Sequence, residues 1–234
     1  MGRSSAVVLV ALAACLAGPA SVAAAGSPKD PTLHRVAADV ALAKTLLIAK
    51  RDLPAGFRDT GPDTSGNGSD DDCKGVVEPD LHRLVMQADL TSHDFDLTDS
   101  ATGFTQVSTE ATLFRSAREA TASMAWFTSL PKSKLHACFE AAFRAGLPKS
   151  AKTQGFRLDV TRRTISDLHL GIWEMGLRLQ KNGTWVPVDF VIASYRRGRA
   201  LEMLLAVNAG GGLDPTLMRT ISETITSRLF HANV

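Results

Sequence analysis

The dipeptide Asn182-Gly183, which separates two runs of alternating apolar residues, limits most strongly how this chain of 234 residues can fold. Asn-Gly favours a two-residue β-hairpin turn, because the turn requires a positive φ that these residues tolerate. Such a turn fixes which residues of the two strands face each other, and every facing pair is apolar. The predicted pairs are Leu179 with Val186, Leu177 with Val188, Met175 with Phe190, and Trp173 with Ile192.

A second turn at Arg197-Gly198 predicts a third antiparallel strand. A one-residue slip in either pairing would turn the shared apolar face to water. The sequence therefore predicts a three-stranded meander with one apolar face, and the alternating segment 155–163 is expected to add a fourth strand. The second turn predicts Ile192 opposite Met203, Phe190 opposite Leu205, and Val188 opposite Val207.

Residues typical of helix starts and ends predict helices in the rest of the chain. Ser116 and Glu119 have the spacing of a capping box, and Asp214-Pro215 places an N-cap before a proline at the first helical position. Two strands around a polar turn are also expected, and the order of elements predicts a single α+β domain with an antiparallel sheet packed by helices. The expected helices run from Pro31 to a point before Pro54, from Ser116 to Pro131, from Leu135 to Gly146, and from Pro215 along Leu217, Ile221, Ile225 and Leu229; the expected strands are Leu84–Leu90 and Phe104–Leu113.

Residues 1–25 predict a signal peptide, which leaves residues 26–234 as the mature domain. An Arg precedes the apolar run from Ala6 to Ala17, and small residues allow cleavage after Ala24 or Ala25. The run is too short to span a bilayer, which takes roughly 20 helical residues. Alternatively, Leu12 to Cys15 resembles a bacterial lipobox, and Cys15 would then carry a lipid anchor. Both interpretations predict a secreted or cell-surface protein, with membrane contact only through such an anchor.

Two cysteines, Cys73 and Cys138, remain once Cys15 is removed or lipidated. Disulfides persist outside the reducing cytosol, so this pair is expected to form one. Closing the loop between Cys73 and Cys138 should stabilise the fold by about 4 kcal/mol in the chain-entropy model.

No motif predicts a catalytic residue, a metal site or a cofactor. The acidic stretch from Asp63 resembles a calcium loop, but Lys74 occupies the position of the closing bidentate Glu. The six histidines include no pair at i and i+4 on one expected helix, and a GxSxG elbow is absent. The glycine-rich segment 208–216 is expected to be a linker before a capped helix, and Arg196 to Arg199 a solvated hairpin tip. Export and a net charge of +2 argue against a nucleic-acid partner.

The second face of the meander, which carries Trp185, Val191, Tyr195 and Leu204, has an unusual amount of aromatic and aliphatic surface. Either a helix covers this face, which is the favoured interpretation, or the face forms part of an amphiphilic cleft. In the second case Arg178, Trp185 and Tyr195 are the candidate ligand-binding residues.

Several short segments resemble the extracytoplasmic sensor-like domains and secreted lipoproteins of actinobacteria, which include the sensor domains of membrane-bound serine/threonine kinases. The matching segments are "LPAGF" after the first helix, the two cysteines, "PDLHRL" and "LHACF". The resemblance implies a helix-packed antiparallel sheet of PsbP-like type with a ligand cleft. Here the kinase domain and its transmembrane helix are absent, and only one disulfide can form.

The leading hypothesis is a non-enzymatic, exported binding or sensor-like module of the cell envelope. Its partner would be an amphiphilic small molecule, a lipid or an envelope protein. The rival hypothesis is a secreted hydrolase whose active site is assembled from separate loops. Convergence of two of His82, His93 and His169 with a carboxylate would favour the hydrolase.

Overall fold

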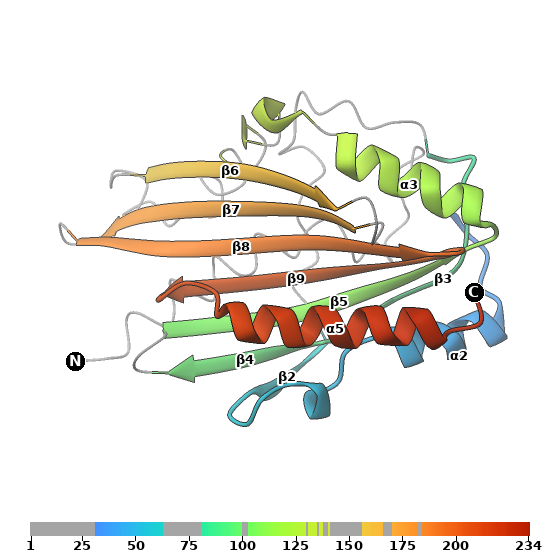
Figure 1. Cartoon of the computed structure of the whole chain (residues 1–234), viewed down its shortest axis with the longest axis horizontal. Coiled ribbons are helices and arrows are strands. Elements are labelled where there is room, and N and C mark those ends of the chain that lie inside the picture. Colours follow the sequence, from blue (N-terminus) through green and yellow to red (C-terminus); the bar gives the residue numbers. More distant parts are fainter. Residues whose placement is uncertain are drawn as a thin grey trace.

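A single nine-stranded sheet organises the protein, as the computed structural model in Figure 1 shows. The structure describes residues 31–62, 81–99, 103–129, 131–134, 136–137, 140, 156–165, 170–181 and 184–234. The strand order is β1-β3-β5-β9-β8-β7-β6, and β4 lies between β2 and β5. All pairings are antiparallel except that of the two-residue strand β1 with β3. The expected α+β class with an antiparallel sheet packed by helices is confirmed. The strands are β1 (Thr32–Leu33), β2 (Arg58–Pro62), β3 (Val85–Thr91), β4 (His93–Asp99), β5 (Gly103–Phe114), β6 (Phe156–Ile165), β7 (Leu170–Lys181), β8 (Thr184–Arg197) and β9 (Ala200–Gly210).

The first predicted hairpin is confirmed in register. All four apolar pairs between β7 and β8 are those that the Asn182-Gly183 turn predicts, and segment 156–165 pairs with β7 as the fourth strand. The register between β8 and β9 differs by two residues from the prediction, because Gly198 and Arg199, rather than Arg197 and Gly198, form the turn. The observed pairs are Ile192 with Leu205, Phe190 with Val207, and Val188 with Ala209.

The segment between β3 and β5 was expected to be a polar turn, and that prediction is wrong. Residues His93–Asp99 form β4, which continues the direction of β3 along β5. Ser92 breaks the run: its backbone N–H donates to the Thr109 carbonyl, and its hydroxyl accepts from the Thr109 N–H. One chain segment therefore lines the whole length of β5, with Phe95 buried and polar residues alternating with it.

The first helix is also shorter than predicted. It is α2 (Ala37–Leu46), followed by a 3-10 turn, η1 (Lys50–Asp52). The Asp30-Pro31 signal does not start it, because the backbone of Thr32 and His34 bonds to β3 instead. Pairing with the sheet thus overrides the local helix signal.

The other two described helices follow their signals. Helix α3 (Ala117–Ser129) has Ser116 as its N-cap: Ser116 Oγ accepts from the Glu119 N–H at 3.3 Å and donates to the Glu119 carboxylate at 3.2 Å. Helix α5 (Pro215–His231) has Asp214 as N-cap, accepting from the Thr216 N–H at 2.9 Å. The predicted stripe of α5 is buried throughout: Leu217, Ile221, Ile225 and Leu229.

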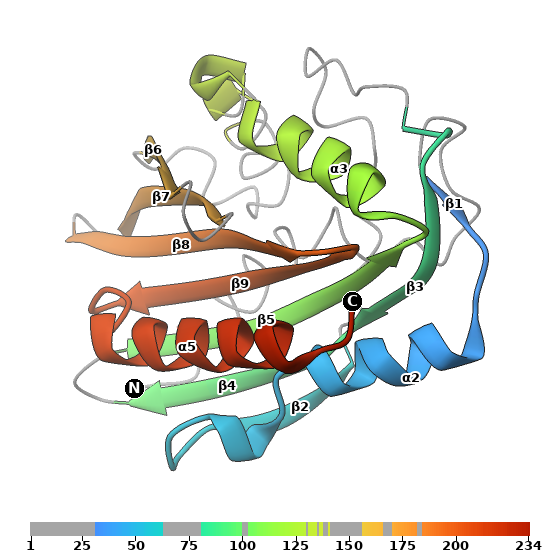
Figure 2. The same cartoon turned by 45° about the vertical axis from the view of Figure 1, so that its right-hand side comes forward.

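Helices cover both faces of the sheet (Figure 2). Helices α2 and α5 pack on one face against Val107, Ala111 and Leu204, which form the main core. Helix α3 packs on the other face, where Ala120 and Met124 meet Phe114 and Leu201 in a smaller core. The second face of the meander is therefore covered by α5, as the favoured interpretation predicted.

The three-glycine linker before α5 is held by Asn208. This side chain is 1% exposed, and its Oδ1 accepts from the N–H groups of Gly211 and Gly212 at 3.2 and 2.7 Å. The segment therefore directs α5 back over the sheet, which agrees with the predicted linker role.

Several sequence predictions lie outside the described residues. They are the signal peptide, the calcium-like loop, the Cys73–Cys138 disulfide and most of the helix 135–146. Among the residues that are described, no helix combines the length and apolarity needed to cross a bilayer.

Candidate functional site

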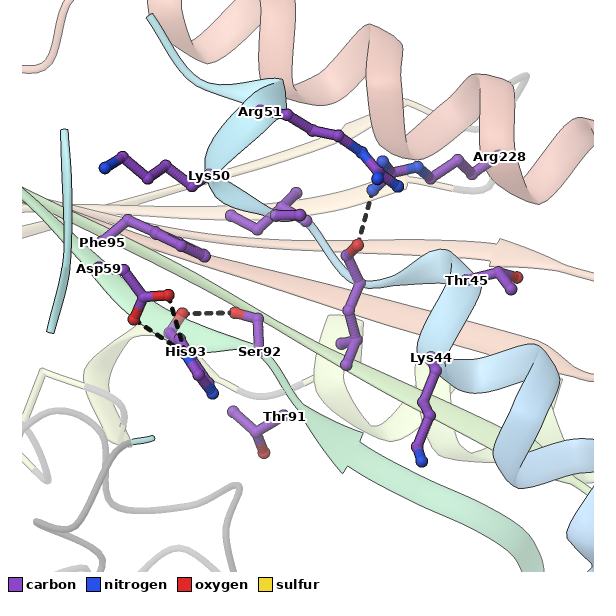
Figure 3. A pocket seen from close by; sticks show the side chains of 13 residues that line it. Lys44, Thr45, Lys50, Arg51, Asp59, Thr91, Ser92, His93, Phe95 and Arg228 are labelled. Atoms are coloured by element: carbon purple, nitrogen blue, oxygen red, sulfur yellow. Dashed lines mark hydrogen bonds and ion pairs between the residues drawn. The ribbon is translucent and has the colours of Figure 1, made fainter. Parts of the chain in front are cut away.

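A pocket of about 520 Å³ lies where the end of α2, the turn η1 and the junction of β3 with β4 meet (Figure 3). Its lining includes the apolar residues Leu47, Ile48 and Phe95, of which the last two are 3% exposed. Its walls carry hydroxyl groups and four cationic side chains: Lys44, Lys50, Arg51 and Arg228. The lining is thus amphiphilic, with an excess of positive charge.

Arg228 of α5 shapes the pocket wall. Its Nη1 donates to the Leu47 carbonyl at 2.6 Å, and its Nη2 contacts both carboxylate oxygens of Asp52 at 2.8 Å. The last carbonyls of α2 have no partner within the helix, so this guanidinium acts as a C-terminal cap from another element. Asp52 in turn accepts from the Ala49 N–H at 2.6 Å. The hydrogen bonds of Arg228 therefore hold the backbone of residues 46–52 in place.

The side chains of the other three cations, Lys44, Lys50 and Arg51, form no comparable hydrogen bonds within the described part of the chain. Lys44 lies in the last turn of α2, and Lys50 and Arg51 open η1. All three residues are exposed, and within the described part of the chain none of them has an ion-pair partner. In Figure 3 Arg51 extends toward Arg228, whereas Lys44 and Lys50 extend to either side. Three cationic side chains that lack an ion-pair partner, around one concave and partly apolar surface with a single carboxylate, favour an anion.

Asp59 is the one carboxylate of the pocket lining. The Gly61 N–H donates to it at 2.9 Å, and His93 Nδ1 lies 2.8 Å from it. The hydrogen bond from Gly61, followed by that from His93, lowers the pKa of Asp59. The charge of Lys50 also lowers the pKa of Asp59, so Asp59 offsets part of the charge of Lys50, but it forms no ion pair with Lys44, Lys50 or Arg51.

Buried beneath Arg228 lies Glu202 of β9. It is 0% exposed, and neither carboxylate oxygen has a hydrogen-bond partner in the described structure. Burial raises the pKa of Glu202 well above its ordinary value, and the nearby Arg228 charge opposes this shift. Burial therefore favours the neutral form of this carboxyl group.

His82 and His93, the two described histidines of the hydrolase hypothesis, do not converge. His93 meets Asp59, but the adjacent Ser92 donates its hydroxyl to the His93 carbonyl at 2.8 Å and not to the ring. His82 precedes β3 and His93 follows it, so the two lie at opposite ends of that strand. His169 lies outside the described residues. Among the described residues, no group of three or more His, Cys, Asp or Glu could hold a metal ion.

The three residues predicted to bind a ligand are not brought together. Tyr195 is 3% exposed under α5, and its hydroxyl lies 2.6 Å from Ser222 Oγ. Arg178 is exposed opposite Pro187, and Trp185 lies opposite Gln180 at the other end of β8. Tyr195 and Trp185 are ten residues apart in β8, so the distance between them along the strand is about 33 Å. A ligand site at Arg178 and Trp185 stays a prediction.

Sequence reasoning missed the pocket. The residues involved come from positions 44–51, 59, 91–95 and 228, which no motif links. The one local signal was "AKRDL", where two adjacent cations lie shortly after the end of α2.

No model of a protein family matches this chain, and no curated protein matches it. Among solved structures, the chain is similar to the extracellular domain of PknH from Mycobacterium tuberculosis, with a TM-score of 0.44 and 12% identity over 85% of this chain and 99% of that one. It is also similar to LpqN, involved in cell envelope biogenesis of Mycobacterium tuberculosis, with a TM-score of 0.29 and 14% identity over 75% of this chain and 78% of that one. At these values the similarities assign neither a family nor a function to this chain.

Proposed function

We propose that the protein is an exported, non-enzymatic binding module that takes an anionic amphiphile into the pocket at the end of α2. The export component rests on residues 1–25, whose pattern is that of a signal peptide. The binding component rests on the chemistry of the pocket. The sensor-like role implied by the resemblance would follow if ligand binding altered the contacts of α2.

The observation that carries the proposal is the set of unpaired cations: Lys44, Lys50 and Arg51. Cationic groups at a protein surface are usually solvated and repel one another, so three around one pocket are explained best by a ligand that neutralises them. Leu47, Ile48 and Phe95 give the lining an apolar part that a hydrocarbon chain would contact. An anionic head with an apolar tail satisfies both parts.

The hydrolase alternative rests on the contact between His93 and Asp59. In that contact the His93 side chain is 52% exposed, and the neighbouring Ser92 hydroxyl is engaged with backbone groups on both sides. A nucleophile in hydrogen-bond reach of the imidazole is what acyl transfer requires. Binding is therefore the better-supported function.

Isothermal titration calorimetry with dodecyl phosphate tests the proposal, with inorganic phosphate and dodecyl maltoside as partial ligands. We expect dodecyl phosphate to bind most tightly, because only it supplies both charge and chain. The variant Lys44→Gln/Lys50→Gln/Arg51→Gln should bind at least about tenfold more weakly, and added salt should weaken wild-type binding.

The matched control is Lys132→Gln/Lys134→Gln/Arg219→Gln, which removes the same number of charges at exposed positions whose side chains form no hydrogen bond or ion pair within the described part of the chain. It should bind as the wild type does. Equal affinity for dodecyl maltoside and dodecyl phosphate, or full binding by the pocket variant, would refute the proposal.

A further inference from the structure

Two short segments with the same residue pattern lie side by side where β1 meets the start of β3. Each has an apolar residue, a histidine, an arginine and a second apolar residue: "LHRV" at 33–36 and "LHRL" at 81–84. The Thr32 N–H donates to the Leu84 carbonyl at 2.9 Å, and the Thr32 hydroxyl donates to the His82 carbonyl at 3.2 Å. These contacts join the two segments into one surface, residues 33–36 and 81–84, which we call the basic edge.

The basic edge exposes apolar side chains. Leu33 and Val36 are 37% and 39% exposed, and they are two of the three large apolar side chains that are exposed in the described part of the chain. The third, Phe230, has the guanidinium of Arg197 over its ring at 3.9 Å. Val36 is the N-cap of α2, and its side chain forms no capping hydrogen bond. Since polar side chains are strongly favoured at an N-cap, Val36 contributes little to the helix that it begins.

Cationic side chains alternate with these apolar groups. Arg35 and Arg83 are exposed, and neither has a hydrogen-bond or ion-pair partner within the described part of the chain. Burial raises the pKa of Asp89, and the charge of Arg35 opposes this shift without forming an ion pair. The two arginines are therefore available to an anionic partner outside the domain.

Two carboxylates at this end of the molecule are already paired. Figure 2 shows β1 beside the start of β3, close to where β5 ends and α3 begins. Glu119 of α3 accepts from Arg115 at 2.6 Å, and Asp39 of α2 accepts from Arg199 at 2.6 and 2.8 Å. Arg118, exposed on α3, adds a cation without an ion-pair partner among the described residues. The surroundings of the basic edge thus keep an excess of positive charge.

Exposed apolar side chains among unpaired cations match the surface of an anionic membrane. Anionic head groups attract arginine side chains, and apolar side chains enter the boundary between head groups and acyl chains. An acidic polymer would pair with the cations but would leave Leu33 and Val36 in water. The chemistry of the basic edge therefore favours a lipid surface.

The position of the basic edge in the chain favours the same partner. Strand β1 follows closely on residues 1–30, and under the lipobox interpretation a lipid on Cys15 would hold β1 near a bilayer. A single acyl chain gives only marginal membrane binding, so a basic patch beside the anchor strengthens it.

We propose that the basic edge docks the folded domain on an anionic phospholipid surface, with Arg35 and Arg83 at the head groups and Leu33 and Val36 at the acyl boundary. This contact adds to a lipid anchor and does not require one. It is separate from the pocket, because the basic edge lies at the start of α2 and the pocket at its end, about 15 Å away for a helix of 10 residues.

Sedimentation with vesicles tests the proposal. The processed protein, purified after export, is mixed with vesicles of equal parts phosphatidylglycerol and phosphatidylcholine, and with vesicles of phosphatidylcholine alone. We expect saturable binding to the anionic vesicles and at least about tenfold weaker binding to the neutral ones. Added salt should weaken binding to the anionic vesicles, because it screens exposed charges.

Two variants separate the charged part of the basic edge from its apolar part. Arg35→Gln/Arg83→Gln should bind anionic vesicles about 10- to 30-fold more weakly, since each arginine near such a surface contributes roughly a fivefold factor. Leu33→Ser/Val36→Ser should bind about 5- to 20-fold more weakly, because less apolar surface leaves water. Serine is a favoured N-cap, so Val36→Ser alone should not lower the melting temperature. The segment before β1 is the same in all the proteins compared and does not alter these ratios.

Two further variants are controls. Lys132→Gln/Lys134→Gln removes two exposed charges after α3, and Lys44→Gln/Lys50→Gln/Arg51→Gln removes the cations of the pocket. Both should bind anionic vesicles within about threefold of the wild type, because their charges lie away from the docked edge. Loss of vesicle binding in the pocket variant would place the lipid contact at the pocket and overturn the proposal.

Three other results would also overturn it. The first is no saturable binding to anionic vesicles, and the second is wild-type binding by the folded arginine variant. The third is wild-type binding by the Leu33→Ser/Val36→Ser variant, which would indicate an acidic partner that needs only charge. None of these results alters the calorimetric test of the pocket, so the two proposals can fail separately.

Discussion

Arg199 offers the sharpest test of how this fold is held together. It was predicted to be part of a solvated hairpin tip, and that prediction is wrong. Its guanidinium contacts both carboxylate oxygens of Asp39 in α2 at 2.6 and 2.8 Å, with side-chain exposures of 24% for Arg199 and 8% for Asp39. It also donates to the Gln87 side chain at 3.0 Å and to the Phe114 carbonyl at 3.3 Å. One side chain therefore joins α2, β3, β5 and the β8–β9 hairpin.

Replacing Arg199 by Ala leaves the Asp39 carboxylate buried without its counter-charge. Removing one partner of a buried pair costs about 3–5 kcal/mol, and the partial exposure of Arg199 favours the lower end. At about 2–4 °C per kcal/mol for a domain of this size, the melting temperature should fall by roughly 6–12 °C. Urea unfolding followed by circular dichroism measures the same change as a free energy.

A double-mutant cycle tests the cause. Asp39→Asn/Arg199→Ala should be more stable than the sum of the single changes predicts, by about 1–3 kcal/mol, because no unpaired charge remains. Arg219→Ala, the same truncation at an exposed position of α5, is the control and should change stability by less than about 0.5 kcal/mol. Equal effects of Arg199→Ala and Arg219→Ala would refute the reasoning.

Three further predictions follow from buried or distant groups. Burial raises the folded-state pKa of Glu202 above its ordinary value of 4.5, so above pH 4.5 the native state retains a proton that the unfolded state loses. The free energy of unfolding should therefore fall as pH rises from 4.5 toward the folded-state pKa. Glu202→Gln should remove this pH dependence in urea unfolding measured between pH 4 and 8. The same change of stability with pH in the variant and in the wild type would contradict the prediction. Tyr195→Phe should destabilise the fold by about 0.5–1.5 kcal/mol in thermal unfolding, through loss of the contact with Ser222, and Ser222→Ala should then add little. Deleting residues 1–25 should retain the protein in the cytoplasm on fractionation, and mass spectrometry without reductant should find Cys73 linked to Cys138 only in the exported form.

The meander could be predicted because strand pairing follows side-chain alternation. The β8–β9 register differs from the prediction by two residues, and an even shift leaves every side chain on its expected face. Gly198 has a φ of +51° and occupies the first position of the turn, which a glycine favours in such hairpins. The apolar pattern thus determines the faces, whereas the turn determines the register.

The wrong predictions share a cause, which is that partners distant in sequence outweigh local signals. Asp30-Pro31 is typical of a helix start, yet Thr32 pairs with β3. The polar composition of 93–99 is typical of a turn, yet the segment pairs with both β2 and β5. The pocket could not be predicted for the same reason, since its residues meet only after α5 crosses the end of α2.

The contacts of α2 also determine when it can form. An isolated helix of 10 residues is marginal in water, and the ion pairs and caps of α2 come from Arg199 and Arg228, about 160 to 182 residues later in the chain. Contacts this distant slow folding, because a long loop must close before they contribute. A ribosome delivers the N-terminal segment first and the stabilising arginines last. Helix α2 therefore gains these partners only when synthesis is nearly complete, an order of events that agrees with the export proposed above.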